Sequence, residues 1–183
     1  MIYAPTQLSD ELNQIRRRAQ ALVHGVPADQ LTRRPDPASW SVAECLAHLN
    51  VTAAVMQSLI AHAIAQGKKA EVFGQGPFKL GVKGRLFIWI AEPPPKFRVR
   101  APKALVPAAP MDDPSQLLVT FLRAQDEWER LWQEAQGLDM ASINIGRRWS
   151  LLRCRLSASF PWMMAHQRRH LLQAEEVLKS RTE

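Results

Sequence analysis

The amino-acid sequence predicts an all-α protein: a four-helix bundle with a long Gly/Pro-rich crossover between its second and third helices. Four long segments place apolar residues at three- and four-residue spacing, and glycines and prolines separate them. No run shows the alternation of a β-strand bounded by hairpin turns. The 183 residues, 46% of them hydrophobic, suit one domain with a sizeable core, so we expect a single domain over residues 1–183.

The first helix is predicted from Thr6 to His24. Its apolar residues lie on one helical face: Leu8, Leu12, Ile15, Ala19 and Leu22. Gly25 and Pro27 end this helix, and a loop is expected over 26–39. The second helix is predicted to begin at Ser41 and to end near Gln66. Its Ser-Val-Ala-Glu start is typical of a capping box, in which a serine and a glutamate bond each other's backbone amides.

Residues 67–113 interrupt the helical pattern with five glycines and seven prolines, and they form the predicted crossover. Within them, residues 84–91 (GRLFIWIA) predict a short helix of one or two turns, with a strand as the alternative. The third long helix starts with Asp113 as its cap and Pro114 at its first position, and ends at Gly137. The last helix is expected over 159–179, with Pro161 in its first turn.

The net charge of +7 belongs to one segment. Residues 67–103 hold nine Lys/Arg and two Asp/Glu, whereas the other 146 residues hold fifteen of each. This segment is either a solvated loop or a contact surface for an anionic partner, which we take to be a lipid surface or an acidic cosubstrate rather than nucleic acid. Charge alone therefore does not define the class of protein.

Cysteine content and hydropathy predict a cytoplasmic protein. Two cysteines are too few for a disulfide framework, and the first residues lack the pattern of a secretory signal. The 23 residues from 45 to 67 carry no Asp, Glu, Lys or Arg, but they include two histidines and several amides. That polarity favours a buried helix over a membrane span.

Two histidines predict a metal site in the last helix. His166 and His170 are four residues apart, so their side chains leave one helical face about 6 Å apart. This spacing suits two ligands of one metal ion; the alternatives are surface histidines or buried ones bonded to backbone and water. Gln167 stands where a metalloprotease motif has its glutamate, so that class is excluded. His48, in the second helix, is the best candidate for a third ligand.

Two stretches resemble the helix signatures of the DinB/YfiT-like four-helix bundles. They are WSVAECLAHL (residues 40–49) and HQRRHLLQ (residues 166–173). The resemblance implies a four-helix bundle with a long crossover, and a three-histidine metal site made of His48, His166 and His170. The crossover of this chain looks longer than is common in the family, which leaves the substrate open.

The resemblance implies a metal-dependent enzyme with zinc or nickel as its divalent ion and a small-molecule substrate. Family members include transferases and isomerases that use bacterial low-molecular-weight thiols, and metal-assisted hydrolysis is a further reading. The alternative is a non-catalytic binding or stress-response module of the same fold that contacts an anionic partner through residues 67–103. A homodimer is also expected, from the family and from the apolar run at 86–91.

Three residues near the predicted ligands have two readings each. Glu44, one turn before His48, either acts catalytically by orienting a ligand or bound water, or only closes the capping box. Gln173, one turn after His170, either contacts a ligand or fills space. Cys45 is expected to be a small core residue rather than a reactive thiol.

Overall fold

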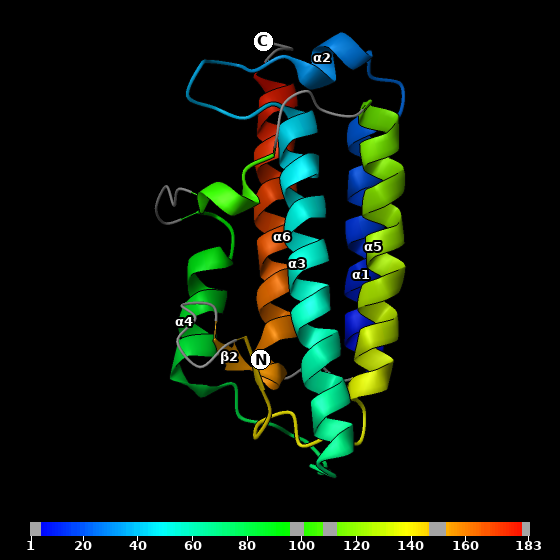
Figure 1. Cartoon of the computed structure of the whole chain (residues 1–183). Coiled ribbons are helices and arrows are strands. Elements are labelled where there is room, and N and C mark those ends of the chain that lie inside the picture. The colour runs from blue at the N-terminus through cyan, green and yellow to red at the C-terminus, as the bar shows by residue number, and fades with distance from the viewer. Residues whose placement is uncertain (1–4, 96–100, 108–112, 147–152, 181–183) are drawn as a thin grey trace.

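The computed structural model describes residues 5–95, 101–107, 113–146 and 153–180, and it confirms the all-α class and the four-helix bundle (Figure 1). The four long helices are α1 (Pro5–Val23), α3 (Val42–Lys69), α5 (Pro114–Ala135) and α6 (Leu156–Lys179). Shorter elements are α2 (Ala28–Thr32), α4 (Gly81–Ala91), a 3-10 turn η1 (Lys103–Leu105), and strands β1 (Asn144–Ile145) and β2 (Cys154–Arg155).

Helices α3 and α5 run parallel, because the crossover returns the chain to the end of the bundle where α3 began (Figure 1). Two side-chain hydrogen bonds fix their register. The amide of Asn50 donates to the carbonyl of Leu117 over 2.9 Å, and that of Gln57 donates to the carbonyl of Ala124 over 2.8 Å. Both bonds join residues 67 positions apart, and this separation stays constant because the two helices are parallel and rise equally per residue.

The core lies between the four long helices, and its members are the positions that the helical spacing predicts. Leu8, Leu12, Ile15, Ala19 and Leu22 of α1 are at most 3% exposed. Trp128 and Phe160 face each other edge to face between α5 and α6, with ring centroids 6.4 Å apart. Helix α3 starts with the expected capping box, in which Ser41 and Glu44 bond each other's backbone amides.

Three local features differ from the sequence prediction. The loop at 26–39 contains α2, whose single buried residue, Leu31, gives no periodic signal over five residues. Helix α6 begins at Leu156, three residues before Ser159, so Pro161 lies inside it, beyond the first turn in which it was expected. The strands β1 and β2 form a two-residue antiparallel pair, which is too short to show alternation.

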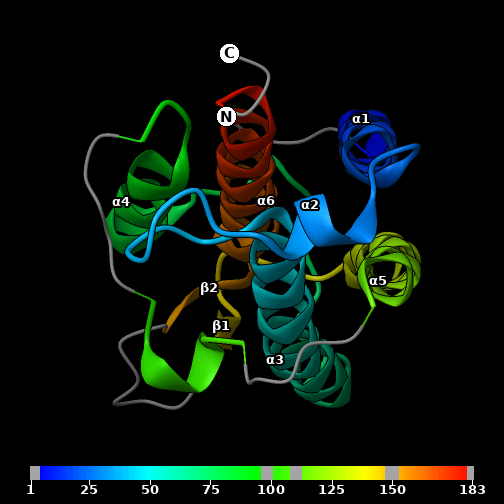
Figure 2. The ribbon, with the colours of Figure 1, turned by 90° about the horizontal axis from the view of Figure 1, so that it is seen from above.

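Helix α4 confirms the short helix expected in the crossover, and it begins at Gly81, three residues earlier than predicted. It lies outside the bundle beside α6, away from α1 and α5 (Figure 2). Gly84 permits this approach, since a Cβ atom there would stand 2.3 Å from the Cβ of Ala158. The rings of Phe87 and Trp162 pack beside it, with centroids 4.8 Å apart. Among the described residues, no helix is long and apolar enough to cross a membrane.

Candidate metal centre

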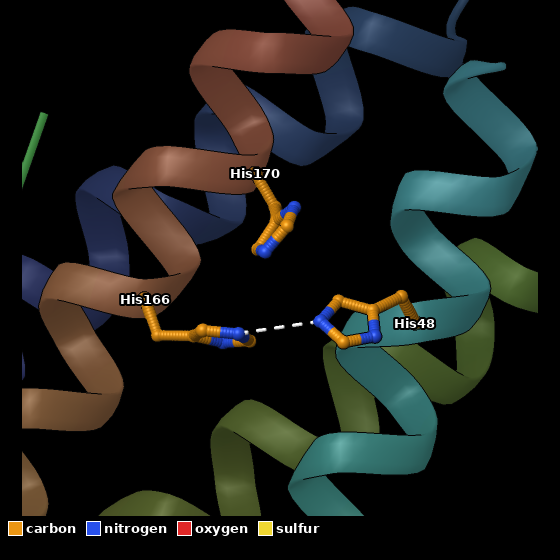
Figure 3. Close-up of side chains that lie close together, drawn as sticks. All are labelled: His48, His166 and His170. Carbon is orange, nitrogen blue, oxygen red and sulfur yellow. Dashed lines mark hydrogen bonds between the residues drawn. The ribbon is translucent and has the colours of Figure 1, made fainter. Parts of the chain in front are cut away.

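The structure brings His48, His166 and His170 together between two helices. His48 lies in the second turn of α3, and the other two lie one turn apart near the middle of α6 (Figure 3). One ring nitrogen from each residue lies within 4.8 Å of the other two. In the described part of the chain, this is the group of side chains suited to holding a metal ion.

The spacing of the ring nitrogens is close to that of a bound set. Nε2 of His48 lies 3.2 Å from Nε2 of His166. Two imidazole nitrogens on one tetrahedral ion, each at ~2.0–2.1 Å, would be about 3.3–3.4 Å apart. The ring of His170 closes the triangle, with its centroid 4.6 Å from that of His48 and 4.7 Å from that of His166.

Hydrogen bonds to the outer nitrogens set the tautomers of two of the rings. Nδ1 of His48 lies 2.7 Å from the carbonyl oxygen of Leu105, which only accepts, so this nitrogen donates. Nδ1 of His170 lies 3.1 Å from Oε1 of Gln173 and donates to it in the same way. In the neutral form each ring then has its lone pair on Nε2, the nitrogen facing the other histidines.

The neutral triad does not satisfy both ring nitrogens of His166. Its Nδ1 is buried and has no hydrogen-bond partner in the described structure, while its Nε2 faces the lone pair of His48. With its proton on Nδ1, His166 would bury an unsatisfied donor, and the lone pair on its Nε2 would face the lone pair on Nε2 of His48. With the proton on Nε2, it would bury an unsatisfied acceptor. The three residues therefore fit a cation at their centre, which would accept the inward-facing lone pairs.

Burial keeps all three imidazoles neutral at pH 7. It lowers the pKa of His48, against a smaller opposing effect of the Leu105 carbonyl. Burial, reinforced by the neighbouring His170, His48 and Arg169, lowers the pKa of His166 well below its usual value. Burial and the charge of His48 lower the pKa of His170 to about 3. Neutral imidazole is the form that binds metal.

Trp40 covers one side of the centre. Its ring centroid lies 4.8 Å from that of His48 and 5.8 Å from that of His170, and its plane is within 28° of the His170 plane. The residue immediately precedes the helix cap Ser41, so the start of α3 places it. The sequence offered no sign of this role beyond the position of Trp40 in the resembled motif.

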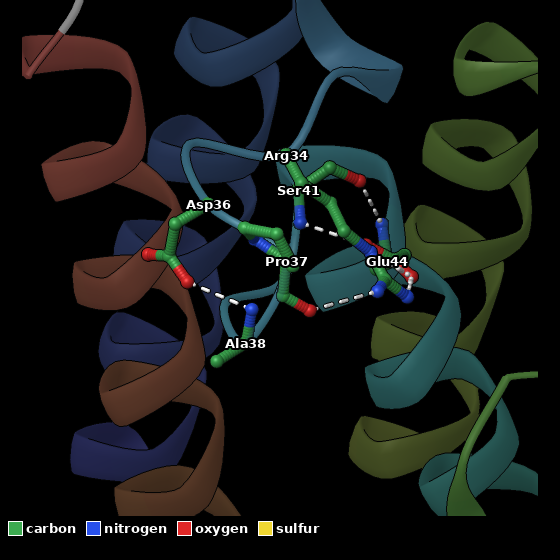
Figure 4. Close-up of polar contacts among 6 residues, drawn as sticks. All are labelled: Arg34, Asp36, Pro37, Ala38, Ser41 and Glu44. Atoms are coloured by element: carbon green, nitrogen blue, oxygen red, sulfur yellow. Dashed lines mark hydrogen bonds and ion pairs between the residues drawn. The ribbon is translucent and has the colours of Figure 1, made fainter.

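Glu44 is held at the start of α3, where its carboxylate accepts hydrogen bonds from the Ser41 amide over 2.9 Å and from Nε of Arg34 over 2.8 Å (Figure 4). The loop that supplies Arg34 is itself closed by a bond from the Ala38 amide to Asp36. Burial raises the pKa of Glu44, but the bonds from Arg34 and Ser41 outweigh it and lower the pKa overall. These contacts account for Glu44 within the described residues, and its catalytic role stays a prediction.

Two further residues are placed as follows. Cys45 is 1% exposed, and burial raises the pKa of its thiol to about 12, which suits the core residue that was expected. Gln173 accepts a hydrogen bond from Nδ1 of His170 over 3.1 Å, so it contacts a predicted ligand, which is the first of its two readings. The sequence could not predict that Leu105 contacts His48, because every residue carries a backbone carbonyl and none marks this position.

Comparison with known proteins agrees with this structure. The family model of the DinB superfamily matches residues 11–174. The solved structure of YfiT from Bacillus subtilis superposes with a TM-score of 0.64 at 12% identity, covering 97% of this chain and 87% of that one. That protein is described as "a probable metal-dependent hydrolase with an unusual four-helix bundle topology". None of the curated proteins matches the sequence. Since the family match spans most of the chain, the protein belongs to the DinB superfamily.

Proposed function

We propose that the protein is a metal-dependent enzyme in which His48, His166 and His170 hold one divalent cation and a small molecule is the substrate. The observation that supports this most strongly is the orientation of the rings, because the outer nitrogens of two of them are satisfied while the inner nitrogens converge. Zinc or nickel is the proposed ion, since imidazole ligands suit both.

The proposed chemistry starts from a nucleophile generated at neutral pH. An ion held by three imidazoles keeps open positions, where it lowers the pKa of water to ~7 or stabilises a thiolate. Water as the nucleophile gives a hydrolase, as described for YfiT, and a low-molecular-weight thiol gives a transferase or isomerase. Both reactions stay in the proposal.

The chain's own residues prepare the site for this chemistry. The carbonyl of Leu105 and the amide oxygen of Gln173 hold the Nδ1 protons of His48 and His170, which fixes both rings with Nε2 inward. Trp40 lies against both rings and limits their rotation. We propose that Glu44 contributes by fixing the first turn of α3, from which His48 projects one turn later.

Metal analysis tests the ligand set. The protein is produced without a histidine tag, and its metal content is measured by mass spectrometry after gel filtration. We expect one zinc or nickel ion per chain in the wild type and in His62→Ala, which removes an exposed histidine of the same helix α3. His170→Ala should lose the ion. Wild-type protein that neither contains nor takes up zinc or nickel would refute the proposal.

Cobalt substitution distinguishes the two reactions. Small thiols are titrated into the Co²⁺-loaded protein, where a thiolate bound to the ion produces a charge-transfer absorption in the near ultraviolet. A band that saturates with thiol, and is missing in His170→Ala, supports thiol transfer. Turnover of simple esters or amides without a thiol supports hydrolysis. The homodimer and the cytoplasmic location stay predictions from the sequence.

A further inference from the structure

Thr52 lies one turn after His48 on α3 and carries a buried hydroxyl without a hydrogen-bond partner. The residue is 5% exposed, and its Oγ1 is among the buried atoms that remain unsatisfied. A threonine inside a helix commonly donates to the carbonyl four residues earlier, which here belongs to His48, but Oγ1 makes no such bond. Burying an unsatisfied hydroxyl costs free energy, so the presence of a threonine here requires an explanation.

The arrangement of the helices places Thr52 on the His166 side of the candidate metal centre. Helices α3 and α6 run antiparallel, because α3 begins at the end of the bundle where α6 ends (Figure 1). Residues four apart share a helical face, so Thr52 is directed toward α6 as His48 is, one turn nearer the start of α6. Of the two ligands on α6, His166 is the one nearer that start.

His166 contributes a second unsatisfied atom in the same region, its Nδ1. The described structure contains seven buried side-chain nitrogen and oxygen atoms without a partner, and Oγ1 of Thr52 is the single hydroxyl among them. A hydroxyl can both donate and accept, whereas an amide oxygen only accepts and an indole nitrogen only donates. Thr52 can therefore serve a ring nitrogen in either of its protonation states.

Nδ1 of His166 needs a partner of this kind. In the metal-free triad, Nε2 of His48 presents a lone pair, so Nε2 of His166, 3.2 Å away, is the nitrogen that donates. Nδ1 then carries a lone pair and needs a donor. When Nε2 binds a metal ion instead, the proton of the neutral ring belongs on Nδ1, which then needs an acceptor. A carbonyl would satisfy only the second state.

We propose that the hydroxyl of Thr52 holds one buried water against Nδ1 of His166, and that this pair allows the ring to change tautomer when the metal binds. The inference rests on the proposed function. Thr52 and Nδ1 are not bonded to each other directly, and a buried water typically bonds about three otherwise unsatisfied polar groups. Thr52 is thus a positioning residue for His166, as Leu105 and Gln173 are for the other two ligands.

The tautomer change leaves the charge of the triad unaltered. Without metal, the water donates to Nδ1 of His166. When the metal binds, Nε2 gives its proton to solvent and Nδ1 takes one from the water, which regains it from solvent. His48 and His170 keep their protons on Nδ1 throughout. The triad therefore binds metal without a net release of protons.

Nitrogen-15 NMR of protein labelled in histidine tests the tautomer change. We expect His166 to carry its proton on Nε2 in metal-free protein and on Nδ1 after zinc is added. His48 and His170 should be protonated on Nδ1 in both samples. Substitution of His24 and His62 with Asn identifies the signals of these two exposed residues. A proton that stays on the same nitrogen of His166 in both samples would contradict the proposal.

Substitution of Thr52 tests its part in holding the ring. Thr52→Val removes the hydroxyl at nearly constant volume and should weaken zinc binding about 10- to 100-fold, as measured by competition with a chromogenic chelator. Thr52→Ser should restore most of this affinity. Ser159→Ala is the matched control, because it removes a buried hydroxyl of α6 that donates to the carbonyl of Leu156 over 2.8 Å. It should lower stability and leave zinc affinity unchanged.

Urea denaturation of the metal-free protein supplies an independent readout. If the Thr52 hydroxyl had no partner, Thr52→Val would relieve an unsatisfied group and raise the stability. We expect no such gain, because the hydroxyl holds the water. A more stable Thr52→Val, or one that binds zinc as tightly as the wild type, would overturn the inference and leave the proposed function intact. Wild-type protein that takes up neither zinc nor nickel would refute the proposed function itself.

Discussion

The backbone carbonyl of Leu105 lies 2.7 Å from Nδ1 of His48 and ties the crossover to α3 at the candidate metal centre. Because the acceptor is a main-chain oxygen, substitution of the Leu105 side chain leaves this hydrogen bond in place unless it displaces the turn η1. The position of η1 and the orientation of His48 are therefore coupled.

Metal binding should protect the crossover. Fixing the His48 ring on an ion strengthens its bond to Leu105, so segment 101–107 should exchange its amide hydrogens more slowly in metal-loaded protein. Hydrogen exchange followed by mass spectrometry measures this. The loop around α2 serves as the internal control, and equal protection of both segments would contradict the coupling.

Gln173→Ala should lower metal affinity about 10- to 100-fold, because an outer partner that orients a histidine ligand is lost. Gln173→Glu retains an oxygen acceptor for Nδ1 of His170 and should bind at least as tightly as the wild type. Competition with a chromogenic chelator measures both affinities. A Gln173→Ala variant that binds metal as tightly as the wild type would show that the bond to His170 does not contribute to metal affinity.

Glu44→Gln separates the two roles of this residue. Glutamine also closes a capping box, so the helix start should persist, although the ion pair with Arg34 is lost. If Glu44 only caps α3, metal affinity and turnover should change by less than about threefold, close to the effect of a weak exposed ion pair. A loss of turnover with unchanged metal affinity and thermal stability would establish a catalytic role.

Metal-free protein should become less stable as the pH falls below about 6.5. The pKa values of His48, His166 and His170 are lowered in the folded chain, so the unfolded chain binds more protons and acid favours unfolding. For His170 this effect continues to about pH 3, the pKa in the folded protein. Each such histidine contributes at most about 1.4 kcal/mol per pH unit.

Urea denaturation between pH 7 and pH 5 measures this dependence in the presence of a chelator. His170→Gln removes one of the three groups and should reduce the slope of unfolding free energy against pH. A stability that is flat over this range would show that the folded and unfolded chains take up protons equally, so that burial does not hold the triad neutral.

Gly84→Ala should detach α4 or strain it by about 1–3 kcal/mol, since the new Cβ would stand 2.3 Å from the Cβ of Ala158. Thermal unfolding measures the loss. Ala158→Gly supplies the compensating space, so the double variant should recover much of the stability. If Gly84→Ala unfolds like the wild type, α4 does not pack as described.

Features with a local or periodic signature could be predicted from the sequence. The capping box at Ser41 and the one-turn spacing of His166 and His170 depend on residues close together in the chain, and both are present in the structure. The sequence made His48 the best candidate for a third ligand and the family resemblance implied the same residue, but its distance from α6 is set by packing alone.

Other features have no such signature. The carbonyl of Leu105 contacts His48, 57 residues away in the chain. Any residue at position 105 would supply this carbonyl, so the contact depends on the path of the backbone and not on the residue type. The stacking of Trp40 on two histidines requires the packing of α3 against α6. The outward face of α4 could not be told from its inward face, because both are apolar and only the contact with α6 distinguishes them.

The parallel arrangement of α3 and α5 sets a minimum length for the chain between them. Helix α3 has 28 residues and is about 42 Å long, so about 13 extended residues would be enough to return along it. The chain spends 44 residues, from 70 to 113, on this return. About 30 residues are thus surplus to connectivity, and evolution can lengthen, shorten or recharge many of them without altering α3 and α6, the two helices that hold the histidines.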